Sequence, residues 1–485
     1  MEFLQNLIIF LIIINTILAI YTVFREKRDI SSTLAWLIVL VLLPGVGFIF
    51  YMFFGRKISR EQIFDIQTQR IIGIEGYVQK QQENLDRENI PLDEALKLPD
   101  VYEMINLFLQ ANNTPLTVDN EVEIFVDGHK KFDRLIEDLE NATDHIHIMY
   151  YIFRYDKLGK RIVDVLERKA EEGVKVSLMY DSLGSRGMKA KYLEKLEANG
   201  GKVLHSLGND FSLLNTNVNF RNHRKIVVVD GKVGYVGGFN VGDDYLGEYE
   251  HMGYWRDTHI RVTGKATWAL QAQFMLDWNA STNDDELRMK HFDNLFPEID
   301  SKGDKLIQIV SSGPDNDLEI NKKGYLKMIS LADKYIYIQT PYFIPDEPVL
   351  ESLLIAIASG IKVKIMIPNK PDHPFIYRAT LWYAKEIVNA GGEVYIYDKG
   401  FLHSKTVVVD GLVSSIGTAN FDIRSFRLNF EINAYIYDQQ TAVENEEIFL
   451  DDVEDSYLLT KEIIKNYSLW EKFKQSFSRL LSPLL

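Results

Sequence analysis

The sequence carries one eight-residue pattern twice, as His223-Arg224-Lys225-Ile226-Val227-Val228-Val229-Asp230 and as His403-Ser404-Lys405-Thr406-Val407-Val408-Val409-Asp410. Both copies continue with the same spacing to Asn240 and Asn420, so each reads H-x-K-x4-D-x6-G-x2-N. A fixed position is matched by chance about one time in twenty at average residue usage, so two complete matches are very specific. The duplication predicts that two related halves build this protein.

The segments around the two motifs also repeat. Each copy has a strand, a helix and a second strand, followed by a further helix and a Gly-Gly strand. The segments are 144–153, 161–172, 173–181, 192–198 and 200–203 in the first copy, and 333–343, 349–359, 360–367, 380–389 and 391–394 in the second. Strands that alternate with helices predict βαβ units and mostly parallel or mixed sheets covered by helices. We therefore predict an α/β fold of two tandem halves, related by a pseudo-twofold axis, with one site at the seam. The alternative is two independent α/β domains, each with its own function.

The spacing within the motif indicates what its residues do. Residues two apart on a strand point to the same face, so the His and the Lys of one motif can converge on one phosphate. The Asp-Gly pair that closes each motif predicts a turn into the next strand. We therefore expect Asp230 and Asp410 to lie at the far end of the strand and to bind backbone or a Lys rather than substrate.

A phosphodiester requires hydrogen-bond donors around its phosphoryl oxygens, because negative charge grows there in the transition state. The residues that would supply these donors are Lys225, Lys405, Asn240 and Asn420. One neutral imidazole would attack phosphorus to give a phosphohistidine, and the other would give its proton to the leaving oxygen. Each half supplies one His, so we expect neither half to work alone.

An attacking imidazole needs a partner that fixes its tautomer. Two carboxylates downstream of the motifs suit this role: Asp257 and Glu431, each a lone acidic residue at the head of an apolar alternating run. We expect both on strands with one buried face. The alternative is that either is a surface carboxylate without this role.

Composition excludes several classes of function. The chain has no Cys, which excludes disulfides, Cys-ligated zinc, iron–sulfur clusters and thiol catalysis. Its net charge of −15 disfavours binding of nucleic acid, which is itself a polyanion.

The N-terminal residues are strongly apolar. Two runs, 4–24 and 34–54, are each long enough to cross a bilayer of about 30 Å and are separated by charged residues. A cleaved signal peptide is disfavoured, because no basic region precedes the first run and a second run follows. We predict a two-helix transmembrane hairpin over 1–57, a helical connector over 58–120, a first half over 121–300 and a second half over 301–485.

These motifs and flanks resemble the phospholipase D superfamily, and within it the membrane-anchored bacterial cardiolipin synthases with two motifs. The resemblance covers essentially the whole chain and includes residues 150–153, 221–225 and 417–426. The sequence departs from the family pattern at Thr418, where the pattern has Ser. Thr also carries a hydroxyl, so this group is retained.

The resemblance implies a multi-pass protein of the bacterial plasma membrane. It implies transfer of a phosphatidyl group from one phosphatidylglycerol to another, which gives cardiolipin and glycerol without metal or other cofactor. The motif residues His223, Lys225, Asp230, His403, Lys405 and Asp410 are implied to form the active site. By the same analogy, His223 is the nucleophile and His403 the acid/base.

Other readings of the sequence remain open. The superfamily also contains nucleases, hydrolytic phospholipases and phosphatidylserine synthases, and fold alone does not choose between them. The residues His145 and His147 alternate on a predicted strand, and we expect them to be hydrogen-bonded core residues rather than metal ligands. Trp255 is expected to fill the core. The helical segment 469–481 either lies at the membrane interface or docks on the body.

Overall fold

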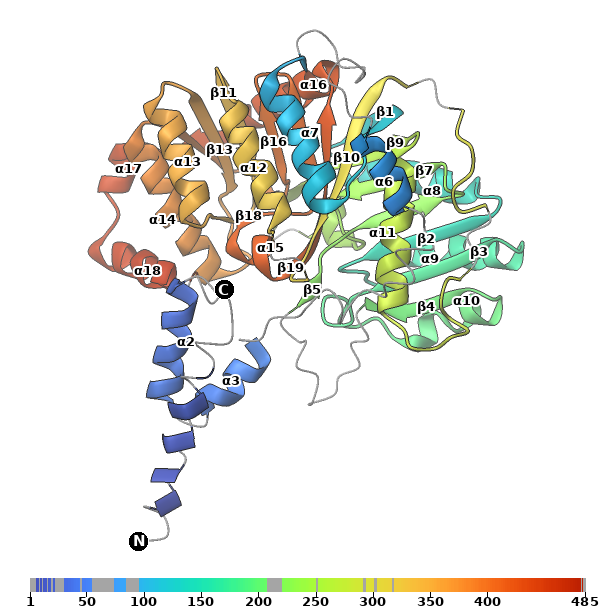
Figure 1. Ribbon diagram of the computed structural model, residues 1–485, viewed down its shortest axis with the longest axis horizontal. Helices are drawn as coiled ribbons and strands as arrows, with labels where there is room; N and C mark the ends of the chain where they lie inside the picture. Colours follow the sequence, from blue (N-terminus) through green and yellow to red (C-terminus); the bar gives the residue numbers. More distant parts are fainter. Residues whose placement is uncertain are drawn as a thin grey trace.

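The computed structural model describes residues 30–43, 46–54, 74–83, 96–206, 220–249, 252–290, 294–300, 303–315, 318–480 and 482, with short pieces between 6 and 21. Across these residues one 16-stranded mixed sheet runs through both halves of the chain, and helices cover its faces (Figure 1).

The first half alternates strands and helices as the sequence predicts. Its elements are β1 (Thr117–Phe125), α8 (Gly128–Glu140), β2 (His145–Tyr150), α9 (Lys157–Glu171), β3 (Lys175–Tyr180), α10 (Glu194–Ala198), β4 (Lys202–His205), β5 (Arg221–Asn222), β6 (Ile226–Val229), β7 (Val233–Gly237), β8 (Tyr254–Arg256), β9 (His259–Thr263) and α11 (Ala266–Ala280). Asp156 begins α9 as its N-cap, because its carboxylate accepts a hydrogen bond from Gly159 N at 3.1 Å.

The second half repeats this order and ends in additional helices. Its elements are β10 (Lys305–Ser312), α12 (Ile320–Leu331), β11 (Tyr335–Gln339), β12 (Phe343–Ile344), α13 (Glu347–Ala358), β13 (Lys362–Pro368), α14 (Pro374–Ala390), β14 (Glu393–Tyr397), β15 (Gly400–Leu402), β16 (Thr406–Val409), β17 (Val413–Gly417), β18 (Phe421–Asp422), α15 (Ile423–Arg427), β19 (Asn429–Tyr437), α16 (Gln439–Glu454), β20 (Ser456–Leu458), α17 (Lys461–Lys465) and α18 (Leu469–Leu480).

The strand order is the same in both halves. In the first half β2, β3 and β4 are parallel neighbours, and β6, β7 and β9 continue the sheet antiparallel. In the second half β11, β13 and β14 are parallel, and β16, β17 and β19 continue antiparallel. The halves join where β10 pairs with both β1 and β19 in the middle of the sheet (Figure 1). The predicted α/β fold of two tandem halves is confirmed.

The core at the seam belongs to both halves. One cluster of buried apolar side chains contains Ile226 and Trp278 from the first half, with Ile416 and Ile432 from the second. Such a shared core excludes the alternative of two independent domains, because separating the halves would expose this surface to water.

The second apolar run of the sequence forms two helices rather than the single span predicted over 34–54. These are α2 (Ile30–Leu42) and α3 (Val46–Phe54), which pack through Trp36 and Tyr51 with ring centroids 5.5 Å apart. The sequence carries Pro44 and Gly45 between them, and proline cannot continue a helix. Within the described residues, no helix has the length and apolarity to span a bilayer. Most of the first run, 4–24, lies outside the described residues.

The predicted connector contains two described helices, α6 (Ile74–Glu83) and α7 (Pro99–Asn112). Figure 1 shows α7 alongside α12 of the second half, and these two helices are in contact. Buried residues of α7, including Met104 and Phe108, belong to the core of the second half. A segment that precedes the first half therefore packs against the second half.

Candidate active site

The two motifs are held at the seam by strand pairs that cross between the halves. β5 ends one residue before His223 and pairs in parallel with the start of β19, whereas β15 ends one residue before His403 and pairs in parallel with β8. The same pairing continues at the histidines, since His223 N donates to Phe430 O at 2.9 Å and His403 N donates to Arg256 O at 2.7 Å. Each motif therefore rests on the half that does not contain it.

This pairing corrects the expectation that the His and the Lys of each motif lie on a strand. The His and Lys of each motif precede β6 and β16 instead of lying within them. The reason is that the chain passes at this point from pairing with the opposite half to pairing within its own sheet.

His403 binds a carboxylate of the first half. Its Nδ1 lies 2.6 Å from Asp257 Oδ2, and the other oxygen of Asp257 accepts from Thr258 N at 2.8 Å. Asp257 is fully buried and lies between β8 and β9, not on a strand as predicted. A carboxylate at Nδ1 holds a proton there, which leaves the lone pair of Nε2 available for reaction.

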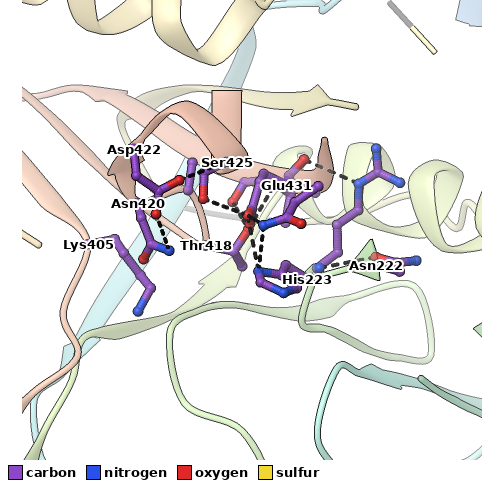
Figure 2. A network of polar contacts seen from close by, with 12 residues as sticks. Asn222, His223, Lys405, Thr418, Asn420, Asp422, Ser425 and Glu431 are labelled. Carbon is purple, nitrogen blue, oxygen red and sulfur yellow. Dashed lines mark hydrogen bonds and ion pairs between the residues drawn. The ribbon is translucent and has the colours of Figure 1, made fainter. Parts of the chain in front are cut away.

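His223 binds a carboxylate of the second half. Its Nδ1 lies 3.2 Å from Glu431 Oε1 and 3.1 Å from Asn429 Nδ2. The same carboxylate oxygen accepts from Ser425 Oγ at 3.0 Å and from Asn429 Nδ2 at 3.2 Å (Figure 2). Glu431 is fully buried on β19. Both predicted carboxylates thus face a motif imidazole, and each comes from the opposite half.

Burial lowers the pKa of both imidazoles. For His223, burial outweighs the opposing effect of Glu431. For His403, burial and the Lys405 ammonium together lower the pKa to about 4 despite Asp257. Both imidazoles are therefore neutral at pH 7 when no anion is bound, and 21% and 16% of their side-chain surfaces remain exposed to an incoming substrate.

Burial raises the pKa of Asp257 and Glu431, but the facing imidazoles and nearby lysines outweigh it. The pKa of each carboxyl therefore lies below its ordinary value, and both are ionised at pH 7.

The two motif lysines are buried, and each donates a hydrogen bond to the backbone carbonyl of its own motif histidine. Burial lowers the pKa of Lys225 to about 8 and that of Lys405 to about 7. Asp257 and Glu431 raise the pKa of both lysines, and Lys225 lowers that of Lys405. Two ammonium groups and two carboxylates from opposite halves therefore act on one another in one site. Figure 2 shows Lys405 on the same side of the polar network as the His223 ring.

Asp230 and Asp410 lie at the opposite end of their strands from the motif histidines. The carboxylate of Asp230 accepts backbone N–H bonds from residues 143–145 at 2.8 to 2.9 Å, and that of Asp410 accepts from residues 333–335 at 2.7 to 3.0 Å. Both residues adopt a φ of 52°, in the turn that the Asp-Gly pair predicts. These bonds confirm that both carboxylates bind backbone, so they position the strands; the active-site role that the resemblance implies for Asp230 and Asp410 stays a prediction.

The two motif asparagines are buried and bind other protein groups. Asn240 Oδ1 accepts from Ile152 N at 3.1 Å, and its Nδ2 donates to Tyr245 Oη at 3.2 Å. Asn420 Nδ2 donates to Asp422 Oδ2 at 3.3 Å, and burial raises the pKa of Asp422 to about 6. Contact of either asparagine with a phosphoryl oxygen stays a prediction.

Sequence reasoning missed several side chains that surround the imidazoles. The ring centroid of Tyr151 lies 4.2 Å from that of His223, and that of Trp255 lies 5.3 Å from that of His403. Trp255 is buried as predicted, but it also contacts the site. The spacing could have indicated that Trp255 and Asn429 lie near the imidazoles, because each stands two residues before an orienting carboxylate.

Within the described part of the chain, no group of three or more His, Asp or Glu side chains is arranged to hold a metal ion. His145 Nε2 and His147 Nδ1 both bind Gln271, at 3.2 and 3.1 Å, and the ring of His147 stacks on Phe274. Their predicted role as hydrogen-bonded core residues is confirmed.

Comparison with known proteins agrees with this geometry. A family model described as "Cardiolipin synthase, PLD-like domain" matches residues 135–275 and 325–453, which contain the two motifs. A second model, described as "Phospholipase_D-nuclease N-terminal", matches residues 13–56. The chain belongs to the cardiolipin synthase family of the phospholipase D superfamily. The family that the motifs and their flanks resemble is thereby confirmed.

Members of the cardiolipin synthase family match over the full chain. The cardiolipin synthase of Listeria monocytogenes serotype 4a (strain HCC23) is 50% identical over 485 residues, which cover 100% of both chains. That of Staphylococcus aureus (strain Mu50) is 49% identical over 482 residues, covering 99% of this chain and 97% of the relative. Among solved structures, the phosphatidylserine synthase of Haemophilus influenzae Rd KW20 aligns with a TM-score of 0.59 at 16% identity, over 79% of this chain and 100% of that chain. This last likeness shows the shared fold alone.

Proposed function

We propose that this member of the family transfers a phosphatidyl group from one phosphatidylglycerol to the glycerol hydroxyl of a second, giving cardiolipin and free glycerol. The observation that supports this most directly is the crossed site, in which two neutral imidazoles each face a carboxylate and a lysine lies beside each. Two such imidazoles suit a reaction that needs one nucleophile and one proton carrier.

In the first step, Nε2 of one imidazole attacks the phosphorus of the donor lipid. A P–N bond forms, the P–O bond to the glycerol headgroup breaks, and the departing oxygen takes a proton from the second imidazole. Lys225 and Lys405 would offer N–H donors to the phosphoryl oxygens, where charge grows in the transition state. By the family analogy, His223 is the nucleophile and His403 the acid.

In the second step, a hydroxyl of the acceptor phosphatidylglycerol attacks the phosphohistidine. The second imidazole, now neutral, takes the proton of that hydroxyl, and the P–N bond breaks to release cardiolipin. Both steps are chemically alike, so the transfer is reversible. Attack by water instead would give phosphatidic acid.

Because phosphatidylglycerol is a membrane lipid, the proposed function places the protein at a membrane. The apolar helices α2 and α3 and the match of residues 13–56 to an N-terminal family model support membrane association of the chain. The same proposal includes a multi-pass membrane anchor within residues 1–57 and a location in the bacterial plasma membrane. It also includes a connector over 58–120 and two halves over 121–300 and 301–485.

The test supplies purified full-length protein with phosphatidylglycerol as the sole lipid and identifies products by mass spectrometry. Cardiolipin and glycerol in equal amounts are expected. Phosphatidic acid as the main product would overturn the transfer in favour of hydrolysis. Acid-quenched protein is then digested and the phosphorylated peptide mapped, and phosphate on His403 would reverse the assignment of the nucleophile.

A further inference from the structure

The C-terminal helix α18 turns its apolar side chains outward. The five large apolar residues of this helix have exposed fractions between 47% and 86%; they are Leu469, Trp470, Phe473, Phe477 and Leu480. Their spacing of three or four residues places them along one side of the helix. The rings of Trp470 and Phe473 and those of Phe473 and Phe477 neighbour each other, with centroids 5.5 and 6.4 Å apart. A continuous aromatic strip therefore faces solvent.

The buried side of α18 is polar, which is the reverse of an ordinary surface helix. Gln475 and Ser478 are each only 1% exposed, and the helix packs on α14. The Arg479 guanidinium lies 4.3 Å from the ring centroid of Trp382 on α14, which fixes the end of the helix. The helix is thus docked on the body with its apolar strip turned away from the protein core.

The surroundings of this strip are basic, although the chain as a whole is acidic. Residues 461–480 hold five basic residues against two acidic ones, in a protein of net charge −15. Aromatic and apolar residues on one side with lysine and arginine beside them are the composition of helices that lie in the interface of anionic bilayers.

We infer that α18 is a second membrane-contacting element, which lies in the headgroup region of an anionic lipid bilayer with its aromatic strip inserted. The strip is defined by the five residues named above. In Figure 1, α18 lies at the same end of the molecule as the apolar helices α2 and α3. Attachment at both chain ends would hold the body at a fixed height and orientation over the lipid.

The helix beneath α18 connects this contact to the active site. α14 begins at Pro374, and the preceding Asp372 accepts a hydrogen bond from Tyr342 Oη and raises the pKa of Lys405. Phe375, in the first turn of α14, is also 48% exposed. A bilayer that contacts the exposed side of α18 is therefore separated by this one helix from α14, whose N-terminus lies near Lys405. The contact itself does not depend on the proposed function, but its benefit to lipid transfer does.

The absence of cysteine allows a direct test on the full chain, because one introduced Cys is the only thiol. Ser476→Cys places a fluorescent label on the exposed side of α18, and Glu171→Cys places it at the exposed end of α9 as the matched control. Both proteins are reconstituted in vesicles of phosphatidylglycerol and phosphatidylcholine. Nitroxide on the lipid acyl chains should quench the Ser476 label several-fold more than the control label, and aqueous iodide should do the opposite.

Two results would overturn the inference. Equal iodide quenching at both positions would mean that α18 faces water. Protection of the Ser476 label from iodide without quenching by the lipid nitroxide, together with cross-linking through this cysteine, would mean that a second copy of the chain covers the strip.

An activity measurement separates docking of α18 on the bilayer from the chemical steps at the active site. The double variant Phe473→Ser, Phe477→Ser should lower turnover of long-chain phosphatidylglycerol in vesicles at least several-fold. It should leave turnover of short-chain, monomerically dissolved phosphatidylglycerol unchanged. Unchanged vesicle turnover would count against a role of α18 in docking, whereas a wild-type protein inactive on both substrates would instead refute the proposed function.

Discussion

Replacement of Asp257 by asparagine tests whether the crossed carboxylates set the tautomers of the imidazoles. Thr258 N donates to one oxygen of Asp257, and His403 Nδ1 faces the other. In Asp257→Asn the amide oxygen will remain on the Thr258 N–H, because that donor is buried and needs an acceptor. The amide NH2 must then face His403 Nδ1, which forces the imidazole proton onto Nε2 and blocks the reacting atom.

The size of the effect follows from two contributions. A hydrogen bond to a charged group is worth about 1.5–3 kcal/mol, and each 1.36 kcal/mol is about tenfold in rate, so loss of the carboxylate alone costs roughly 10- to 150-fold. Reversal of the tautomer in a catalytic triad raises the cost to about 10⁴-fold. We expect kcat of Asp257→Asn to fall by about 10² to 10⁴.

The corresponding change at the other imidazole should cost much less. Ser425 Oγ and Asn429 Nδ2 both donate to the Glu431 oxygen that faces His223, so in Glu431→Gln the amide oxygen stays there and the imidazole keeps its acceptor. We expect a decrease of about tenfold, because a neutral acceptor replaces a charged one.

The assay measures the initial rate of cardiolipin formation from phosphatidylglycerol, with thermal unfolding measured on the same samples. Asp138→Asn is the matched control, since this buried carboxylate of the first half binds Arg261 and faces no motif imidazole. It should lower the melting temperature and leave kcat unchanged. Equal losses in Asp257→Asn and Glu431→Gln, or a larger loss in the latter, would refute the tautomer argument.

Three further predictions concern the motif residues. His223→Ala and His403→Ala should each abolish cardiolipin formation measured by mass spectrometry, since each half supplies one imidazole, and an active single variant would contradict the shared site. The profile of kcat/KM against pH should fall as pH increases above the lowered imidazole pKa values, both below 6.5, because one imidazole must take up a proton as the lipid binds, and it should fall further above about 7 to 8 as Lys405 and Lys225 lose the protons that bind the phosphodiester; a profile flat from pH 6 to 9 would contradict this. Asp230→Asn should lower the free energy of unfolding by about 1 kcal/mol at pH 7, and this difference should disappear as pH falls from 3.8 through the lower pKa of Asp230 in the folded protein, because the carboxyl stabilises the fold only while it is ionised; equal melting temperatures at pH 7 would refute it.

The repeated α/β elements could be predicted from the sequence, because their signals are local. The apolar run at 144–153 became β2, and the helix predicted over 161–172 became α9, which begins earlier than its apolar spacing suggests because Asp156 caps it. The Asp-Gly turns and their backbone-binding carboxylates were also predictable, because a turn depends on a few adjacent residues.

The crossed pairing of the site could not be predicted. Asp257 and His403 are 146 positions apart, and each carboxylate follows the motif of its own half by a plausible distance. Spacing along the chain is equally compatible with pairing inside a half and pairing across the seam, and only the parallel contacts of β5 with β19 and β15 with β8 decide between them. The division of the second apolar run into α2 and α3 was missed for a different reason. The prediction followed the apolar character of the whole run and gave no weight to Pro44 and Gly45 in the sequence.

The charges of the crossed site explain how neutral imidazoles can supply a proton. Without substrate and below pH 7, the two ionised carboxylates balance the two protonated lysines, and the imidazoles become neutral above their own pKa values, which burial lowers. A bound phosphodiester adds one negative charge to this buried group, and a nearby negative charge raises the pKa of an imidazole. In the proposed mechanism we therefore expect one proton to be taken up as the lipid binds, onto the imidazole that protonates the leaving oxygen. We expect the other imidazole to stay neutral, because in that mechanism its attacking nitrogen faces phosphorus, so binding of the anion would itself distinguish the acid from the nucleophile.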